Sequence, residues 1–283
     1  MVRIISDSTC DLSKELCERY GIKLLPLHVL LGDDDYQDGV DIRPETIFEW
    51  SDRTKTTPKT AAPSLAETED LFRTILDEGD EIVAFSISAS MSSSNNVMHL
   101  AMQSLEAEDR ISVIDSANLS TGIGLLVVRA AEMAQKGKER SEIVSQMERL
   151  IPLVRASFVV DTLVFLHRGG RCSGLAALAG STLKLHPKIE VAGGAMGAGK
   201  KYRGSLDTVI MKYVREMEEQ LKEAVPDHVF ITHSGVDPVL VEEVRSYLVS
   251  LGRFEEIHET RAGGVISSHC GPGTLGVLFI AGA

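Results

Sequence analysis

The chain has 283 residues, of which 43% are hydrophobic and 25% charged, so it can bury one large or two ordinary cores and is not expected to be disordered. Its formal net charge of -12 argues against nucleic-acid binding, which needs a basic surface. Four separated cysteines without a CxxC pair indicate neither a disulfide framework nor a structural zinc site. Without a signal peptide or about 18 consecutive apolar residues, we expect a cytoplasmic chain with no stable membrane insertion.

Three segments of the first half share one order: a short strand, a polar turn and a helix. The predicted strands are Val2–Ser6, Ile82–Phe85 and Ile111–Ile114. The helices that follow are predicted over Leu12–Tyr20, from Asn95 onward, and over Thr121–Gln135. This alternation predicts a parallel sheet covered by helices, with ligands bound at the carboxyl ends of the strands. The polar turns lie at those ends, and we expect Asp7 or Ser8 to cap the first helix.

Between these units, Asp33–Asp41 is an acidic stretch predicted to be a hairpin tip, and Thr54–Ser64 is predicted to be a loop. Ser64 and Glu67 fit a capping box at the start of an acidic helix. In the second half the pattern predicts the following elements in chain order: a helix over 139–150, a strand near 156–161, a hairpin of 188–192 and 200–204, a helix over 205–224, a strand over 228–233, a helix over 238–251, and strands over 254–260 and 277–280. We place an N-terminal α/β domain at residues 1–165 and a C-terminal α+β domain at 166–283. The segment of about residues 54–80 is expected to be able to pack with the second domain.

The serine turn is the first functional signal. Six serines lie between Ser86 and Ser94, directly before a predicted helix. Free N–H groups at a helix N-terminus, together with nearby hydroxyls, favour an anion such as a carboxylate or phosphate. Because the turn contains no acid, base or metal ligand, binding is favoured over cleavage. His269, beside Gly271-Pro272-Gly273, either donates to an anion or packs at a strand end, and spacing leaves both open.

One segment of the chain matches a nucleotide-binding signature. Gly194–Lys201 fits GxxxxGK, but Lys201 stands where a P-loop needs Ser or Thr, so a hairpin turn is favoured over a nucleotide site. No GxSxG or HExxH motif supports a serine hydrolase or zinc protease. No catalytic residue, metal ligand or cofactor is therefore predicted.

Several motifs, in order over nearly the whole chain, resemble the DegV family of bacterial fatty-acid-binding proteins. They are Ile4–Leu12, the Thr60–Ser64 loop, the turn around Ser92, Val113–Ser116 with Gly122 and Gly124, Arg168-Gly169-Gly170-Arg171, and His269 with Gly271–Gly276. The resemblance implies a three-layer N-terminal domain with a parallel sheet, a C-terminal α+β domain with a mixed sheet, and a ligand tunnel between them. The sequence departs from the family pattern at Ala61 and at Ser93-Ser94-Asn95-Asn96.

The resemblance also implies a ligand and a partner. The ligand is one long-chain fatty acid such as palmitate, stearate or oleate, presented to a fatty acid kinase that makes acyl-phosphate. The implied head-group residues are Thr60, Ser92, His269 and Arg203, with Ser93 beside them. Small and flexible apolar residues are expected to line the tunnel: Ala62, Met91, Ala176, Ala177, Leu178 and Met196.

An enzyme is the alternative interpretation. Ser92 with His269 as its base would give an acyl hydrolase or transferase, but such chemistry needs a third, orienting carboxylate that the sequence does not reveal. A nucleotide binder built on Gly194–Lys201 is a further possibility. Co-purified lipid would favour the carrier, Ser92-dependent ester turnover the enzyme, and ATP binding the nucleotide site.

Overall fold

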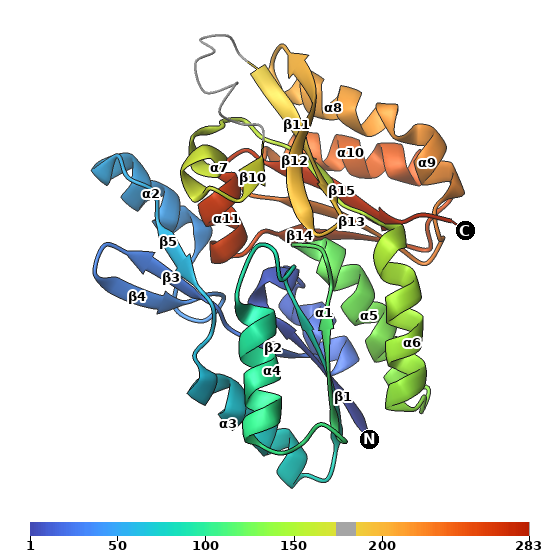
Figure 1. The fold of residues 1–283 in the computed structure, drawn as a ribbon. Helices are drawn as coiled ribbons and strands as arrows, with labels where there is room; N and C mark the ends of the chain where they lie inside the picture. Colours follow the sequence, from blue (N-terminus) through green and yellow to red (C-terminus); the bar gives the residue numbers. More distant parts are fainter. Residues whose placement is uncertain (174–184, 283) are drawn as a thin grey trace.

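The structure is a computed structural model that describes residues 1–173 and 185–282. A four-stranded parallel sheet with strand order β2-β1-β6-β7 forms the N-terminal part (Figure 1). Its strands are β1 (Val2–Asp7), β2 (Lys23–Leu25), β6 (Glu81–Ser86) and β7 (Ile111–Asp115). Helices α1 (Lys14–Tyr20), α5 (Thr121–Gln135) and α6 (Arg140–Leu150) lie on one face, and α3 (Leu65–Asp77) and α4 (Ser94–Ser104) on the other. The predicted parallel three-layer arrangement is confirmed.

Alternation along the strands explains why both faces of this sheet are covered. In β1, Ile4 joins the core under α5 whereas Ile5 joins the core under α3 and α4. In β6, Val83 likewise faces α5, and its neighbour Ile82 faces the opposite side. Successive side chains of a strand point to opposite faces, so a continuous apolar run requires helices on both.

The C-terminal part contains a larger mixed sheet with order β10-β12-β11-β9-β15-β13-β14, and β8 pairs with β15. Its strands are β8 (Val154–Arg155), β9 (Ser157–Val159), β10 (Cys172–Ser173), β11 (Leu185–Ala192), β12 (Ala195–Arg203), β13 (His228–His233), β14 (Glu256–Arg261) and β15 (Leu275–Ile280). One face is covered by α8 (Leu206–Glu216), α9 (Glu218–Glu223) and α10 (Pro238–Ser250). The single helix predicted over 205–224 is thus broken at Met217.

A small third sheet projects beside these two, with order β4-β3-β5 (Figure 1). It consists of β3 (His28–Leu31), β4 (Asp34–Gln37) and β5 (Lys59–Ala61), with α2 (Pro44–Thr54) beside it. The acidic stretch at 33–41 therefore supplies a strand as well as a turn, and the predicted loop at 54–64 contains a strand. Val265 of α11 (Gly264–Cys270) joins the core of this sheet, so the segment before α3 does contact the C-terminal part.

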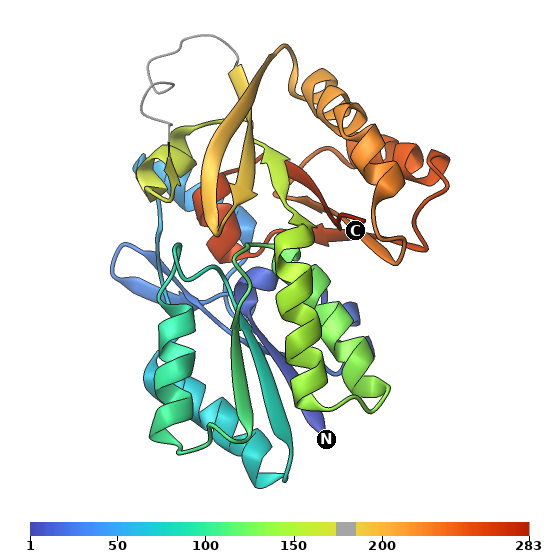
Figure 2. The same cartoon turned by 45° about the vertical axis from the view of Figure 1, so that its right-hand side comes forward.

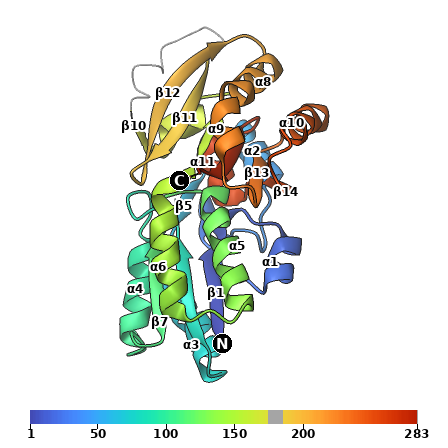
Figure 3. The same ribbon diagram turned by 90° about the vertical axis from the view of Figure 1, so that its right-hand side faces the viewer.

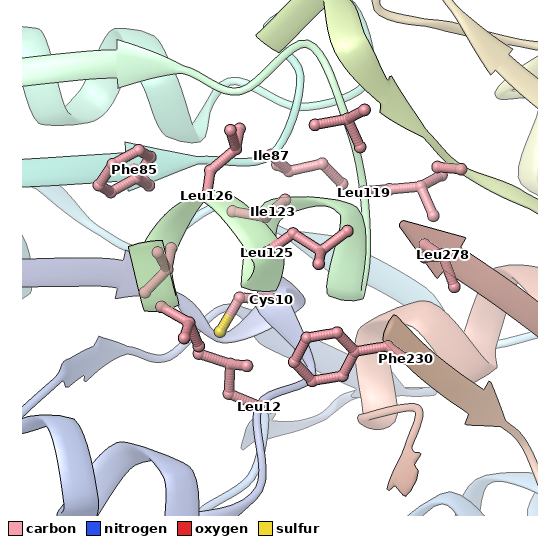
Figure 4. Packing of buried hydrophobic residues seen from close by; sticks show 14 of the residues in the cluster. Cys10, Leu12, Phe85, Ile87, Leu119, Ile123, Leu125, Leu126, Phe230 and Leu278 are labelled. Carbon is pink, nitrogen blue, oxygen red and sulfur yellow. The ribbon is translucent and has the colours of Figure 1, made fainter. Parts of the chain in front are cut away.

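Helix α5 lies between the two larger sheets. Figure 4 shows Phe85 and Ile87 on one side of it and Phe230 and Leu278, from β13 and β15, on the other. All of these side chains belong to one continuous hydrophobic core. A helix that packs on both sides must be apolar around most of its circumference, and ten residues of α5 are buried.

The division into two domains at residue 165 remains a prediction. Strands β8 and β9 precede that position and already lie in the larger sheet. The short helix η2 (Ile151–Leu153) leads into β8, and α7 (Val164–Gly169) follows β9 in the chain. Figure 3 shows the parallel sheet with its helices stacked against the mixed sheet. Within the described residues, no helix combines the length and apolar content that crossing a bilayer requires.

Candidate functional site

An apolar cavity of about 210 Å³ lies where the three sheets meet. It is lined by Leu27, Thr60, Ala61, Ala62, Ile87, Met91, Ser92, Ser93, Leu119, Arg171, Met196, Val265, Ile266, His269 and Cys270. Among these described lining residues there is no carboxylate, and the polar side chains are hydroxyls, one imidazole and one guanidinium. Such a lining suits a ligand with an apolar body and a negatively charged end.

Thr60 and His269 meet at this cavity although 209 positions separate them in the sequence. Thr60 lies on β5 and pairs with Val29 of β3, which fixes its position at the sheet edge. His269 lies in the last turn of α11. The Thr60 Oγ1 and His269 Nε2 atoms are 2.9 Å apart, a hydrogen bond. His269 therefore lies in a helix and lines the cavity, and its donation to an anion stays a prediction.

Two buried carboxylates hold the N-terminus of α11 and so place His269. Asp11 accepts a hydrogen bond of 2.8 Å from the Gly263 N–H, and Asp38 accepts one of 2.6 Å from the Gly264 N–H. Burial raises the pKa of both carboxyl groups above their usual range, and their mutual repulsion adds to the pKa rise of Asp11. Since Asp11 comes from the turn after β1, the first polar turn of the chain anchors the histidine helix.

The first turn is capped differently from the prediction. Asp7 accepts from the Thr9 N–H within the short helix η1 (Ser8–Cys10), and from the Ile87 N–H at the end of β6. The N-cap of α1 is Ser13. Asp7 thus ties together the ends of two adjacent strands, close to the cavity residue Ile87.

The serine turn divides into two roles. Ser88 donates a hydrogen bond of 2.6 Å to the Gly194 carbonyl, and Ser90 also donates to it, so the tip of the β11–β12 hairpin is held against this turn. Figure 2 shows this hairpin reaching toward the loop before α4. Ser92 and Ser93 line the cavity, and the Ser92 hydroxyl accepts from the Ser94 N–H at the start of α4.

The same hairpin gives the nucleotide-site interpretation no support. Gly194 lies in the tight turn between antiparallel strands, with a φ of 81° that favours glycine. A P-loop instead joins a strand to a helix. The Gly194–Lys201 match is a hairpin.

His269 is neutral at physiological pH. Burial, and then the nearby charge of Arg171, lower its pKa from 6.5 to about 4. Its buried Nδ1 has no hydrogen-bond partner among the described residues. A Cβ built on Gly169 would lie 2.4 Å from that Nδ1, so only a glycine at the end of α7 leaves room for the ring.

The structure separates the two arginines of interest. Arg203, implied as a head-group residue, ends β12 as an exposed residue and is not among the lining residues. Arg171 lines the cavity instead. In the sequence it belongs to the Arg168–Arg171 motif of the family resemblance, which does not assign it a role. Of the expected tunnel residues, Ala62, Met91 and Met196 line the cavity, whereas Ala176, Ala177 and Leu178 lie outside the described residues.

The geometry gives the hydrolase interpretation no support. His269 Nε2 faces Thr60, and among the described residues no hydrogen bond joins it to Ser92. In a Ser–His–Asp triad, a carboxylate holds the other imidazole nitrogen, and here that nitrogen has no partner in the described chain.

Comparisons with known proteins agree on one family. The family model described as "Uncharacterised protein, DegV family" matches residues 1–282. The chain is 34% identical to a DegV domain-containing protein of Deinococcus radiodurans, over 98% of each chain. A structure titled "Fatty Acid Binding of a DegV family Protein from Thermus thermophilus" has 31% identity and a TM-score of 0.88, with 99% of each chain covered. A stearic acid-binding protein from Eubacterium ventriosum has 30% identity and a TM-score of 0.86, covering 99% of this chain and 98% of its own.

Proposed function

This chain belongs to the DegV family, and we propose that it binds one long-chain fatty acid with the carboxylate at the Thr60–His269 pair. The observation that carries the proposal is the apolar cavity whose polar end offers hydrogen-bond donors and, among the described lining residues, no acid. Two proteins of similar fold, from Thermus thermophilus and Eubacterium ventriosum, are described as binding fatty acid. Such a carrier would need no catalytic group of its own.

The head group requires donors because a buried carboxylate without hydrogen bonds is very unfavourable. In this proposal Thr60 Oγ1 turns its hydroxyl hydrogen from His269 to the ligand, and His269 donates as a neutral imidazole. Ser92 and Ser93 add donors at the start of α4, and the exposed guanidinium of Arg171 supplies positive charge at the mouth of the cavity. Charge-assisted hydrogen bonds of this kind are about twice as strong as neutral ones.

The tail supplies most of the driving force. About fifteen buried methylenes give a gross transfer free energy of about 12 kcal/mol. The cavity of about 210 Å³ is larger than the roughly 150 Å³ engineered cavity that accepts benzene, but a full acyl chain needs more room. We propose that Met91 and Met196 move aside to admit it, because unbranched thioether side chains change rotamer readily.

The proposed fate of the ligand rests on the resemblance to the DegV family. A separate fatty acid kinase, working with this chain in the cytoplasm, would transfer the γ-phosphoryl group of ATP to a carboxylate oxygen. The products would be acyl-phosphate and ADP. The assay is transfer from radiolabelled ATP by such a kinase, with and without the loaded chain.

Binding itself is tested by mass spectrometry of the freshly purified chain after denaturation, followed by titration of the delipidated chain with palmitate, stearate and oleate. A stoichiometric fatty acid supports the proposal, and its absence together with no uptake contradicts it. Thr60→Val removes one hydrogen bond to a charged group, about 1.5–3 kcal/mol, so its affinity should fall roughly 10- to 100-fold. Thr74→Val, on the exposed part of α3, is the matched control and should leave affinity unchanged.

A further inference from the structure

A second cluster of ligand-type side chains lies away from the cavity, where β13 and β14 face α5. His228 begins β13, and Glu256 and His258 stand two residues apart on β14. His228 pairs with Glu256 in the strand register, so the three side chains are neighbours on one face of the sheet. Their ligand atoms all lie within 4.8 Å of one another. None of the three lines the fatty-acid cavity.

The imidazole rings of His228 and His258 approach each other through ring nitrogen atoms. His228 Nδ1 and His258 Nε2 are 3.0 Å apart, and Glu256 Oε2 is 3.7 Å from the same His258 nitrogen. Two histidine nitrogens and one carboxylate oxygen form a donor set that zinc-type ions prefer, and three protein ligands leave the fourth position open.

The Glu132 carboxylate fixes the tautomer of His228 that metal binding through Nδ1 requires. Glu132 of α5 has its Oε1 atom 3.1 Å from His228 Nε2. The ring proton is therefore at Nε2, which leaves the Nδ1 lone pair directed at the cluster. A carboxylate on the far nitrogen of a histidine is the usual arrangement around protein-bound metal ions. His258 needs only to carry its proton on Nδ1 for its Nε2 to become the second nitrogen ligand.

Burial and ring stacking hold the two histidine side chains in fixed positions. The His228 side chain is 7% exposed and that of His258 is 11% exposed. The Phe230 ring stacks on His258 with centroids 4.7 Å apart, which restricts its orientation. From these contacts we propose that His228, His258 and Glu256 bind a divalent transition-metal ion of the zinc type, with Glu132 orienting His228.

Arg19 competes with a metal ion for the Glu256 carboxylate. Its guanidinium donates two hydrogen bonds of 2.8 Å to the Glu256 carboxylate. The Arg19 side chain is 54% exposed, so solvent screens this ion pair, and a divalent ion can compete with Arg19 for the carboxylate oxygen. Removing this arginine should therefore tighten metal binding, a direction that a purely structural role of the cluster does not predict.

The experiment uses the full chain without a histidine tag, freed of metal by chelation. Co²⁺ is titrated and its visible ligand-field absorption followed, and Zn²⁺ is then added to displace it. We expect saturation at one equivalent, at least tenfold weaker binding in His258→Phe, and tighter binding in Arg19→Gln. His258→Phe retains a ring against Phe230, and His99→Gln, in a histidine outside the cluster, should bind as the wild type does.

Glu256→Gln serves as the second variant, because the Glu256 side chain is 34% exposed and can be changed without disturbing the core. It too should bind at least tenfold more weakly, and Zn²⁺ should raise the melting temperature of the wild type but not of this variant. Absence of a saturable Co²⁺ band in the wild type would overturn the proposal. Equal affinity of the wild type, His258→Phe and Glu256→Gln would overturn it as well, and would leave Glu132, His228 and His258 as a hydrogen-bonded chain only.

Discussion

The protonation of His269 gives a quantitative prediction about stability. Its pKa is about 4 in the folded chain against a usual value of 6.5, because burial disfavours the charged ring. The unfolded chain therefore takes up more protons than the folded chain between these values, and stability must fall as pH drops from 6.5 toward 4. From the two pKa values, this one residue should remove about 2 kcal/mol of unfolding free energy between pH 7 and pH 5.

The comparison is between the wild type and His269→Gln, each delipidated and unfolded by urea at both pH values. Glutamine does not titrate and can still hydrogen-bond to Thr60. Asp7, whose pKa burial raises to about 6, acts in the opposite direction, but it is common to both chains and cancels in the difference. The wild type should lose about 2 kcal/mol more than the variant. Parallel losses in the two chains would refute the buried, neutral imidazole.

Two further substitutions test the packing. Gly169→Ala should push the His269 ring out of its place at the cavity and weaken fatty-acid binding roughly fivefold, by about 1 kcal/mol for the impaired hydrogen bond from His269 to the carboxylate. Gly199→Ala, whose new Cβ meets no atom closer than 3.2 Å, should leave binding unchanged, and equal affinities of the two variants in calorimetry would contradict this reasoning. Phe85→Ala should lower the unfolding free energy by about 3–5 kcal/mol in urea titration, because the ring is fully buried. Leu100→Ala, at a position 44% exposed, should change it by less than about 0.5 kcal/mol, and a similar small loss for Phe85 would argue against its place in the core.

Local sequence was sufficient for the elements whose packing follows their own pattern. The unit of β6, serine turn and α4 was predicted because an apolar run, a polar turn and a helical period follow each other directly. Helix α5 was predicted with its observed bounds because it is long and strongly apolar. These elements depend on propensity and burial that a short window contains.

Helix α11 could not be predicted in the same way. It has seven residues, begins at Gly264 and ends before Gly271-Pro272, so its sequence is typical of a turn. The groups that satisfy its first N–H donors are the carboxylates of Asp11 and Asp38, more than 220 positions away. No local pattern contains that information.

The candidate site shows the same limit. The Thr60–His269 pair joins residues of two distant segments, and only the family resemblance indicated that they belong together. The same resemblance implied Arg203, which the fold leaves at an exposed strand end, and it did not assign a role to Arg171, which lies at the cavity. A motif preserves the order of residues along a chain but does not determine which of two arginines reaches a pocket.

The position of α5 has a consequence for how the chain can be divided. Because this helix supplies apolar side chains to both larger sheets at once, a fragment ending near residue 165 would expose one flank of it to water. Such a fragment should aggregate or remain partly unfolded. The intact chain should lose its structure in a single cooperative transition, and deletion of either half should not yield an independently stable product.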